Sequence, residues 1–372
     1  MELESADVHR LSVPMRGSYG SAHHREFTTM ESTLVVLTDT DGRRGIGTAD
    51  ATPGYSRQTH DDIQRSLTDH ILPSLLDRNP RHPNGLDALL REFHGIPNAK
   101  CAVEMAWLDL YCRRDDRPLH GLLNGPLQER VALNGWVGID TPAEMASEAR
   151  TWRDDGYQSV KIKLSGDPEG DIERVQAVCD AVADEMQVRA DVNAGYDVET
   201  AIDVARRLES LPLVHLEQPV PKDDIAGLAA VTESTTTTIM ADECIQTAGD
   251  AFEVLKGEAA DRIKVKALRL GGLFGTRRVQ DAADLAGVEC VLGHGFGLTP
   301  ATSAELQLAA TQSNVFEGVE CVGPLKMQVE PFEPAIDFED GTAVLPDGPG
   351  LGVDLAGDEL DEFVTQSARV ER

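Results

Sequence analysis

The stretches Ser159-Val-Lys-Ile-Lys-Leu164 and Arg262-Ile-Lys-Val-Lys-Ala267 each place two lysines two positions apart, and together they hold four of the chain's eight lysines. Each is a short apolar run, and a segment with helical periodicity follows it. Three isolated carboxylates lie between the two stretches, each also at the end of an apolar run: Asp191, Glu217 and Asp242. The intervals from Lys163 through these carboxylates to Lys266 are 28, 26, 25 and 24 residues. This spacing predicts a repeated strand–helix unit.

Extending the repeat reaches His294 and Glu320 at the ends of two further apolar runs, and residues 133–137 supply an opening strand. The count of strands is then eight, as in a (β/α)8 barrel. Such a barrel has its active site at the C-terminal ends of its strands, where these ionisable residues fall. We therefore expect an α/β protein in which residues 128–329 form a TIM-like barrel that carries the catalytic groups.

The sequence pattern differs at both ends of the chain. Residues 8–15 and 31–41 predict strands, and three stretches between residues 61 and 114 have apolar residues at helical spacing. Residues 1–127 are therefore predicted to form a separate α+β domain, a small antiparallel sheet packed with helices. Residues 330–372 have strand and turn signals without the barrel period, and we expect them to pack back on this first domain.

Charge and composition restrict the possible partners and location. The chain of 372 residues has 64 acidic and 34 basic residues and a net charge of −30, which disfavours binding to nucleic acid or to anionic membranes. Broad acidity with few lysines resembles halophilic proteins of salt-rich cytoplasms. No run of eighteen apolar residues and no signal-peptide pattern are present, so a cytoplasmic protein is expected. The six cysteines form no Cys-x-x-Cys pair, which argues against a zinc site or a disulfide framework.

The two lysine pairs suggest acid–base chemistry. Residues i and i+2 of a strand face the same side, so Lys161 projects with Lys163 and Lys264 with Lys266. Like-charge proximity and partial desolvation lower the pKa of a lysine and make it a possible general base near neutral pH. Alternatively, the first lysine of each pair, Lys161 or Lys264, only neutralises barrel carboxylates.

The three carboxylates suggest a metal site. Asp191, Glu217 and Asp242 follow three successive strands, so we expect them to converge within a few ångströms and to need a cation to remain ionised together. Three carboxylates plus water oxygens suit Mg²⁺, which leaves positions open for a substrate, and Mn²⁺ is a possible substitute. Each acidic residue alone could instead be an ordinary solvated surface group.

These residues resemble the motifs of the enolase superfamily, and specifically of the mandelate racemase/muconate lactonizing enzyme family, over nearly the whole chain. The motifs are Lys161-Ile-Lys163, Asp191-Val-Asn193, Glu217-Gln-Pro219, Asp242-Glu243, and Lys266 before Gly271-Gly272. The resemblance implies an N-terminal capping domain on a modified barrel and magnesium bound by the three carboxylates, with Asn193 and Glu243 in supporting roles. Lys266 and the segment Glu320-Cys-Val-Gly-Pro-Leu325 resemble the muconate lactonizing subgroup.

The sequence departs from that subgroup at Gly293-His294-Gly-Phe-Gly297, where a Gly-Ser-x-x-Glu type segment is usual. His294 could bind a substrate carboxylate, assist proton transfer, or form a hydrogen bond in the barrel mouth. Loops near residues 16–24 and 52–56 could close over the mouth and determine specificity. The candidate contacts in these loops are Arg16, His23, His24 and Tyr55.

Together these features predict abstraction of the α-proton of a small carboxylate substrate, with Mg²⁺ stabilising the enediolate that forms. Lys163 and Lys266 would face each other across the mouth, one removing a proton and the other returning it, as in a racemase or epimerase. The same pair serves a muconate-type cycloisomerase, and an acid-sugar or hydroxy-amino-acid dehydratase is an alternative. The candidate catalytic residues are Lys163, Lys266 and Lys161, and the candidate supporting or substrate-binding residues are Asn193, Glu243, Lys264, His294, Glu320 and Tyr55.

Two more distant alternatives belong to other classes. In a Schiff-base aldolase, Lys266 would be the nucleophile, and borohydride trapping would detect the imine. A non-catalytic binding protein would have no need for two opposed lysines. A homo-oligomer is expected, and the sequence does not identify the substrate.

Overall fold

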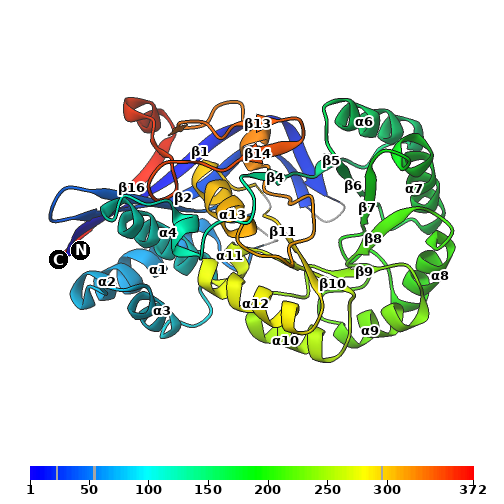
Figure 1. Ribbon diagram of the computed structural model, residues 1–372, viewed down its shortest axis with the longest axis horizontal. Helices are drawn as coiled ribbons and strands as arrows, with labels where there is room; N and C mark the ends of the chain where they lie inside the picture. The colour runs from blue at the N-terminus through cyan, green and yellow to red at the C-terminus, as the bar shows by residue number, and fades with distance from the viewer. Residues whose placement is uncertain (22–23, 53–55, 295) are drawn as a thin grey trace.

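The computed structural model describes residues 1–21, 24–52, 56–294 and 296–372. Its N-terminal part is built on an antiparallel sheet with the strand order β16-β1-β2-β3. The bounds of these strands are β1 Leu3–Ser21, β2 His24–Asp39, β3 Arg44–Ala49 and β16 Val364–Glu371. β1 and β2 form a long hairpin, and the C-terminal strand β16 pairs with β1, so the two ends of the chain lie side by side (Figure 1).

Helices pack against one face of this sheet, and α4 is buried along most of its length. The helices are α1 (His60–Ser66), the π-helical turn η1 (Leu67–Ile71), α2 (Leu72–Arg78), α3 (Pro83–Arg91), α4 (Pro97–Arg114) and α5 (Leu119–Leu122). Strand β3 approaches α4 closely at two glycines. A Cβ atom at Gly47 would lie 2.3 Å from the carbonyl oxygen of Ala102, and one at Gly45 would lie 2.3 Å from that of Ala106.

The second part is a parallel sheet that curls into a barrel, in the order β11-β10-β9-β8-β7-β6-β5 (Figure 1). Its strands are β5 (Gly135–Val137), β6 (Ser159–Lys163), β7 (Gln187–Asp191), β8 (Leu213–Glu217), β9 (Ile239–Ala241), β10 (Arg262–Val265) and β11 (Glu289–Leu292). In β6 the fully buried Val160 and Ile162 alternate with the two lysines. The period of two therefore sends the apolar side chains outward to the helices and the lysines into the barrel.

Helices cover the outside of the curled sheet (Figure 1). They are α6 (Pro142–Asp154), α7 (Pro168–Val182), α8 (Val198–Leu208), α9 (Ile225–Ser234), α10 (Ala248–Lys256), α11 (Ala267–Leu270), α12 (Leu273–Leu285) and α13 (Thr299–Ala309). The expected α/β fold with a modified TIM barrel is confirmed.

The eighth strand position differs from the expectation of a regular strand. Residues 315–320 close the barrel through isolated parallel bridges, Gly293↔Glu320 on one side and Leu133↔Val319 on the other. The reason is a buried arginine on β7. Arg189 donates hydrogen bonds to the carbonyl oxygens of Gly318, at 2.7 Å, and of Glu317, so these carbonyls bind a guanidinium in place of a neighbouring strand.

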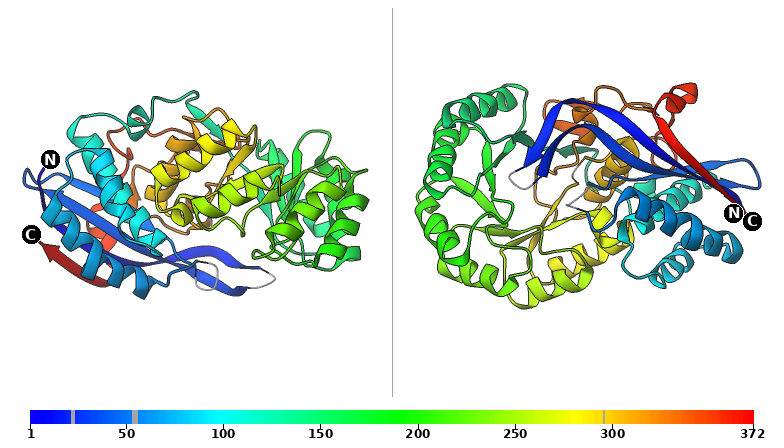
Figure 2. Two further views of the ribbon diagram at one scale, coloured as in Figure 1. Left: turned by 90° about the horizontal axis from the view of Figure 1, so that it is seen from below. Right: turned by 180° about the vertical axis from the view of Figure 1, so that it is seen from behind.

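The C-terminal segment returns from the barrel to the N-terminal sheet. Its short strands are β12 (Phe332–Glu333), β13 (Phe338–Glu339), β14 (Thr342–Val344) and β15 (Asp354–Leu355), and β14 pairs with β4 (Arg130–Ala132). The 3₁₀ helices η2 (Gly323–Lys326) and η3 (Gly357–Glu362) flank this segment. Just after η2, the Gln328 N–H donates to the carbonyl of Pro14 on β1 at 2.9 Å. The chain after the eighth strand position is thus tied to the hairpin, which extends alongside the barrel (Figure 2).

A buried carboxylate links the two parts on the other side of the barrel. Glu104 of α4 accepts the backbone N–H groups of Leu273 and, at 3.3 Å, of Phe274. These two groups are at the N-terminus of α12, where the helix dipole favours a negative charge. The six cysteines are free and buried. No helix in the described part of the chain has both the length and the apolarity to cross a membrane.

The close approach of β3 to α4 generates a stability prediction. The substitution Gly47→Ala puts a methyl group 2.3 Å from a backbone oxygen, so β3 or α4 must move, and we expect a loss of about 1–3 kcal/mol in unfolding free energy. The control Gly138→Ala adds the same group where no atom lies within 4 Å. Urea unfolding followed by circular dichroism measures both. Equal midpoints for the two variants would contradict the packing argument.

Candidate active site

The register of the parallel sheet brings the strand-end charges to one level. Asp191 is the last residue of β7 and is the register partner of Lys163 on β6 and of Glu217 on β8. Asp242 directly follows β9, and Lys266 directly follows β10. Because parallel strands present their C-terminal ends at the same edge, the five side chains surround one end of the barrel. The structure therefore brings together the residues that the sequence spacing singled out.

The outermost layer of this cluster contains the second lysine of each pair. Lys163 Nζ lies 2.6 Å from Asp191 Oδ2 and 2.9 Å from Asn193 Oδ1. Asn193 in turn donates to Glu243 Oε1 at 2.8 Å. Across the mouth, Lys266 Nζ lies 2.8 Å from Asp242 Oδ2. Each of these two lysines thus contacts a different one of the strand-end aspartates.

A deeper layer contains the first lysine of each pair. Lys264 Nζ lies 2.6 Å from Glu217 Oε1 and 2.8 Å from Glu320 Oε1. Lys161 Nζ lies 2.6 Å from Glu320 Oε2 and 3.4 Å from Glu217 Oε2. The two lysines and two glutamates therefore alternate in a closed ring of ion pairs in the barrel interior. This is the arrangement expected of lysines that neutralise barrel carboxylates.

The expectation that the paired lysines lower each other's pKa is not met on β6. Burial and Lys161 act to lower the pKa of Lys163, but the contact with Asp191 outweighs them and raises it. The pKa of Lys161 is likewise raised, because three carboxylates outweigh its burial. Only on β10 does burial dominate, lowering the pKa of Lys264. The sequence argument considered neighbours within one strand and left out the carboxylates of the adjacent strands.

The pKa values of the three strand-end carboxylates shift in different directions from their ordinary values. Burial acts to raise the pKa of Asp191, but Lys163, Lys161 and Lys264 lower it to about 2. For Glu217, burial and then the neighbouring Asp191 raise the pKa to about 8. The pKa of Asp242 is lowered well below its usual value, because Arg269 and Lys266 outweigh burial. A further positive charge beside Glu217 would keep it ionised.

The residues fit a hard divalent cation by their chemistry, though not by their present spacing. Asp191, Glu217 and Asp242 are buried oxygen donors on adjacent strands, a set that suits Mg²⁺. No choice of one oxygen from each of these three described residues gives atoms that all lie within 4.8 Å of one another, and each carboxylate contacts an ammonium group. Among the described residues, the set of three candidate ligand atoms that all lie within 4.8 Å of one another belongs to His294, Glu305 and Cys321.

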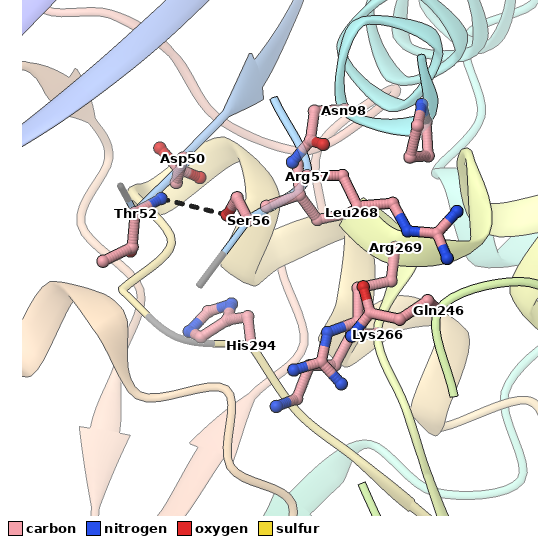
Figure 3. A pocket seen from close by; sticks show the side chains of 11 residues that line it. Asp50, Thr52, Ser56, Arg57, Asn98, Gln246, Lys266, Leu268, Arg269 and His294 are labelled. Atoms are coloured by element: carbon pink, nitrogen blue, oxygen red, sulfur yellow. Dashed lines mark hydrogen bonds between the residues drawn. The ribbon is translucent and has the colours of Figure 1, made fainter. Parts of the chain in front are cut away.

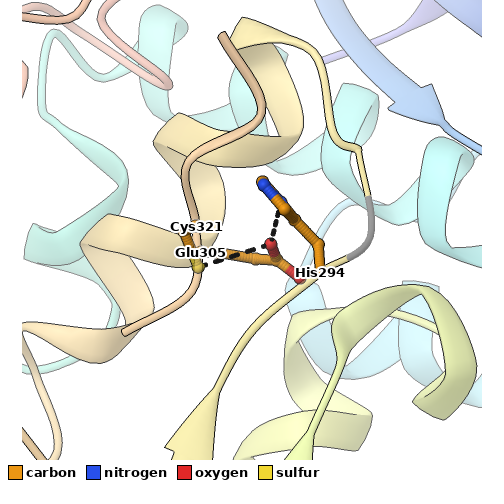
Figure 4. A group of neighbouring side chains, drawn as sticks. All are labelled: His294, Glu305 and Cys321. Carbon is orange, nitrogen blue, oxygen red and sulfur yellow. Dashed lines mark hydrogen bonds and ion pairs between the residues drawn. The ribbon is translucent and has the colours of Figure 1, made fainter. Parts of the chain in front are cut away.

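The side chains of that second set lie together at the side of the barrel mouth (Figure 4). His294 Nε2 accepts the backbone N–H of Gly323 at 3.1 Å. His294 Nδ1 lies 2.7 Å from Glu305 Oε2 without hydrogen-bond geometry, and Cys321 Sγ donates to the same oxygen at 3.7 Å. Of the three roles considered for His294, this geometry favours hydrogen bonding in the barrel mouth.

A pocket opens beside Lys266, between the two parts of the chain (Figure 3). Its lining residues from the N-terminal part are Asp50, Thr52, Ser56, Arg57, Pro97 and Asn98, and those from the barrel are Gln246, Lys266, Leu268, Arg269 and His294. Tyr55, His23 and the side chain of His24 lie outside the described part of the structure. Arg16 donates to the carbonyl of Met327 at 2.7 Å, a contact between the hairpin and the barrel.

Several residues at this site were not identified from the sequence. Arg269 Nη1 lies 2.6 Å from Asp242 Oδ1, and its position three residues after Lys266 on a helical turn is a signal that could have found it. Gln218 accepts the backbone N–H of Asp242 at 3.0 Å and thereby orients that residue. Lys326 Nζ lies 4.9 Å from the ring of Trp136 and 4.5 Å from that of Phe296. These last two contacts join distant segments, and no local pattern indicates them.

Residues 4–124 match the mandelate racemase/muconate lactonizing enzyme N-terminal domain, and residues 144–359 match the enolase C-terminal domain-like family. The chain belongs to the mandelate racemase/muconate lactonizing enzyme family. It is 31% identical to an L-Ala-D/L-Glu epimerase of Bacillus subtilis, over 95% of this chain and 97% of that protein. It is 28% identical to a chloromuconate cycloisomerase of Delftia acidovorans, over 98% and 99% of the two chains.

Solved structures of family members have the same fold. The N-succinyl Arg/Lys racemase from Bacillus cereus superposes with a TM-score of 0.94 at 26% identity and covers all of both chains. The dipeptide epimerase from Enterococcus faecalis, solved with Mg and the dipeptide L-Leu-L-Tyr, superposes with a TM-score of 0.88 at 25% identity, over 95% of this chain and 100% of that one. These relatives are all isomerases, and the expected family membership is confirmed.

The buried ring of ion pairs generates a second stability prediction. The substitution Lys264→Met leaves Glu217 and Glu320 with one cation fewer in the barrel interior, and we expect a loss of about 3 kcal/mol in unfolding free energy. The matched control is Lys256→Met on α10, whose side chain is 66% exposed and should change stability by less than about 0.5 kcal/mol. Denaturant unfolding of both variants checks this. A Lys264→Met protein as stable as the control would show that the ring contributes nothing.

Proposed function

We propose that this protein is a magnesium-dependent racemase or epimerase that exchanges the α-proton of a small carboxylate substrate, with an amino-acid derivative as the preferred class. The observation that carries the proposal is the placement of Lys163 and Lys266. They belong to β6 and to the end of β10, and the three strands between them carry the three candidate metal ligands. In a closed barrel of eight positions, strands four apart lie on opposite sides. A substrate held on the intervening carboxylates would therefore have one lysine on each face.

Asp191, Glu217 and Asp242 are the proposed magnesium ligands, with Asn193 and Glu243 in support. When bound, the ion would supply a positive charge that stabilises the negative charge developing on the substrate carboxylate as the α-proton leaves. The acidic residues would then be shared between the ion and the ammonium groups that contact them now. The presence of Mg in the dipeptide epimerase from Enterococcus faecalis supports this assignment.

The environment of Lys163 explains how it could act as a base. In its contact with Asp191 the ammonium form is favoured, and the pKa is raised. Burial and the nearby Lys161 both act in the opposite direction. If Asp191 Oδ2 were engaged elsewhere, these two effects would remain and would favour the neutral amine. The proton-accepting form of Lys163 would thus be available when the carboxylate site is occupied.

A muconate-type cycloisomerase is the second candidate. It is favoured by the full-length similarity to chloromuconate cycloisomerase and by the segment Glu320-Cys-Val-Gly-Pro-Leu325, which resembles the muconate lactonizing subgroup. Only one lysine need transfer a proton in that reaction. A Schiff-base aldolase with Lys266 as the nucleophile is the more distant alternative, and borohydride trapping with a carbonyl substrate would detect its imine.

The metal assignment predicts that each strand-end carboxylate is needed for binding. Asp191→Asn, Glu217→Gln and Asp242→Asn each remove one negative charge and one anionic ligand, so Mg²⁺ affinity should fall by more than about ten-fold in each. Titration calorimetry with Mg²⁺ measures the affinity directly, without a substrate. The control Asp223→Asn removes an exposed carboxylate of the barrel and should bind as the wild type does. Wild-type affinity in all three ligand variants would refute the site.

The lysine assignment predicts a stereochemical division of labour. With an epimerised substrate, Lys163→Ala should still exchange the α-proton of one enantiomer with D₂O, and Lys266→Ala that of the other. Net epimerisation should fall by at least about a hundred-fold in both, because it needs an acid as well as a base. NMR detection of deuterium incorporation follows each enantiomer separately. If the double variant still epimerises the substrate, the two-lysine mechanism is wrong, and exchange that depends on one lysine alone would favour cycloisomerisation.

A further inference from the structure

The barrel interior contains polar side chains without hydrogen-bond partners on the side of the ion-pair ring that faces away from the mouth. Ser159 on β6, Arg189 on β7 and His215 on β8 each precede a residue of the charged cluster by two positions, so they point into the barrel one layer deeper. Their exposed fractions are 2%, 0% and 0%. Ser159 Oγ, Arg189 Nε and both imidazole nitrogens of His215 have no hydrogen-bond partner within the described part of the chain.

The three side chains lie close to one another. Arg189 and His215 are register partners on adjacent strands. A Cβ atom at Gly318 would lie 2.3 Å from Ser159 Oγ and 2.6 Å from Arg189 Nη2, so the hydroxyl and the guanidinium are neighbours. The ring of Phe316 has its centroid 6.3 Å from that of His215 and 5.0 Å from Arg189 Cζ. Ser159, Arg189 and His215 thus form one cluster, which we call the barrel-floor site.

The unpartnered atoms of this site indicate an occupant. Buried polar groups of native proteins nearly always have a hydrogen-bond partner, either in the protein or in a bound small species. Leaving such a group without a partner is unfavourable, because it has lost its hydrogen bonds to water. Four such atoms from three adjacent strands point to one shared partner more readily than to four separate defects.

The charge of Arg189 favours an anion over water as this partner. Its guanidinium donates to the two carbonyl oxygens of the eighth strand position and, at 3.4 Å, to Gln187 Oε1, all of which are neutral. No carboxylate of the described residues forms an ion pair with it. Burial lowers the pKa of Arg189 to about 10, against the opposing effect of Glu320 in the ion-pair ring. The group is therefore a buried cation at neutral pH, and buried charges are normally paired.

The neighbours of His215 also make this region positive. Burial, followed by Arg189, Lys264 and Arg262, lowers the pKa of His215 well below its ordinary value. The imidazole is then neutral and offers one N–H donor. Arg262 Cζ lies 3.9 Å from the centroid of the Phe316 ring, on which Arg189 also lies. The barrel-floor site thus combines N–H and O–H donors with an excess of positive charge.

We propose that the barrel-floor site binds a small monovalent anion, chloride or another halide, which accepts hydrogen bonds from Arg189 Nε, Ser159 Oγ and one nitrogen of His215. A halide accepts hydrogen bonds from several directions and has no further polar atoms to satisfy in an enclosed site. It would supply the counter-charge of Arg189 and tie three strands together beneath the ion-pair ring. This site is separate from the proposed magnesium ligands and from the pocket beside Lys266, and it does not depend on the proposed reaction.

Bromide is the crystallographic probe, because its anomalous scattering distinguishes it from water. Wild-type crystals grown in potassium bromide should show an anomalous peak within hydrogen-bonding distance of Arg189 Nε. Water without anomalous signal at this place would overturn the inference.

A solution measurement tests binding at lower concentrations. The midpoint of thermal unfolding is measured while potassium chloride replaces potassium methanesulfonate, whose anion is larger, at constant total salt. Chloride should stabilise the wild type with saturation, because a ligand of the native state shifts the unfolding equilibrium. Ser159→Ala and His215→Phe each remove one donor, so the apparent chloride affinity should fall about ten-fold in each. Arg189 is left unchanged, because its contacts close the barrel.

The matched control is Ser147→Ala on α6, which removes an exposed hydroxyl and should keep the wild-type response to chloride. If the site is dry, Ser159→Ala and His215→Phe only remove unpartnered polar atoms, and both should be more stable than the wild type in either salt. That result would overturn the inference, as would a chloride response that survives in both variants. A bromide peak without a saturable chloride response would mean an adventitious ion only, and the inference would again be wrong.

Discussion

The structure of the barrel mouth depends on lysines and carboxylates that alternate from strand to strand. None of these charges could be buried alone, because removing an ion from water costs several kcal/mol unless an opposite charge and hydrogen bonds compensate. In the deeper ring, Lys264 and Glu217 are both fully buried and 2.6 Å apart. The ring fixes the strand ends relative to one another, and the outer lysines and aspartates lie next to it at these strand ends. A structural charge network and a candidate reaction site thus share one set of side chains.

This sharing explains why the two lysines of each pair have different surroundings. Lys161 and Lys264 point into the barrel, where two glutamates hold them from either side. Lys163 is less deeply placed, with 30% of its side chain exposed, and it contacts a single aspartate. A shift of two residues along one strand therefore separates a position suited to stability from a position suited to proton transfer.

The sequence predicted the features that depend on local spacing. Strand ends repeat at the interval of one strand–helix unit, so Lys163, Asp191, Glu217, Asp242 and Lys266 could be placed in the barrel mouth in advance. The alternation of apolar residues and lysines in β6 likewise indicated which side chains face inward. These predictions needed only the period of a strand and the length of a repeat.

Features that depend on contacts between distant segments could not be predicted in this way. The pKa of Lys163 is decided by Asp191 on the next strand, and the irregular eighth position is decided by the reach of Arg189 from β7. Asp50 has no motif around it, and it lines a pocket together with residues more than 200 positions away, such as Lys266. A spacing argument specifies the strand end on which a side chain lies but not the partner toward which it turns.

The hydrogen bonds from α12 to Glu104 join helix α4 to the segment that begins at Lys266. Between them, a Cβ atom at Gly271 would lie 3.3 Å from Lys100 Cε, so α4 also touches the turn that follows the lysine. The N-terminal helix α4 is therefore in direct contact with the segment that follows Lys266, the lysine proposed to transfer the proton. Replacing the N-terminal domain by that of a relative would change the contacts beside Lys266 together with the pocket wall, so substrate choice and turnover rate should change together.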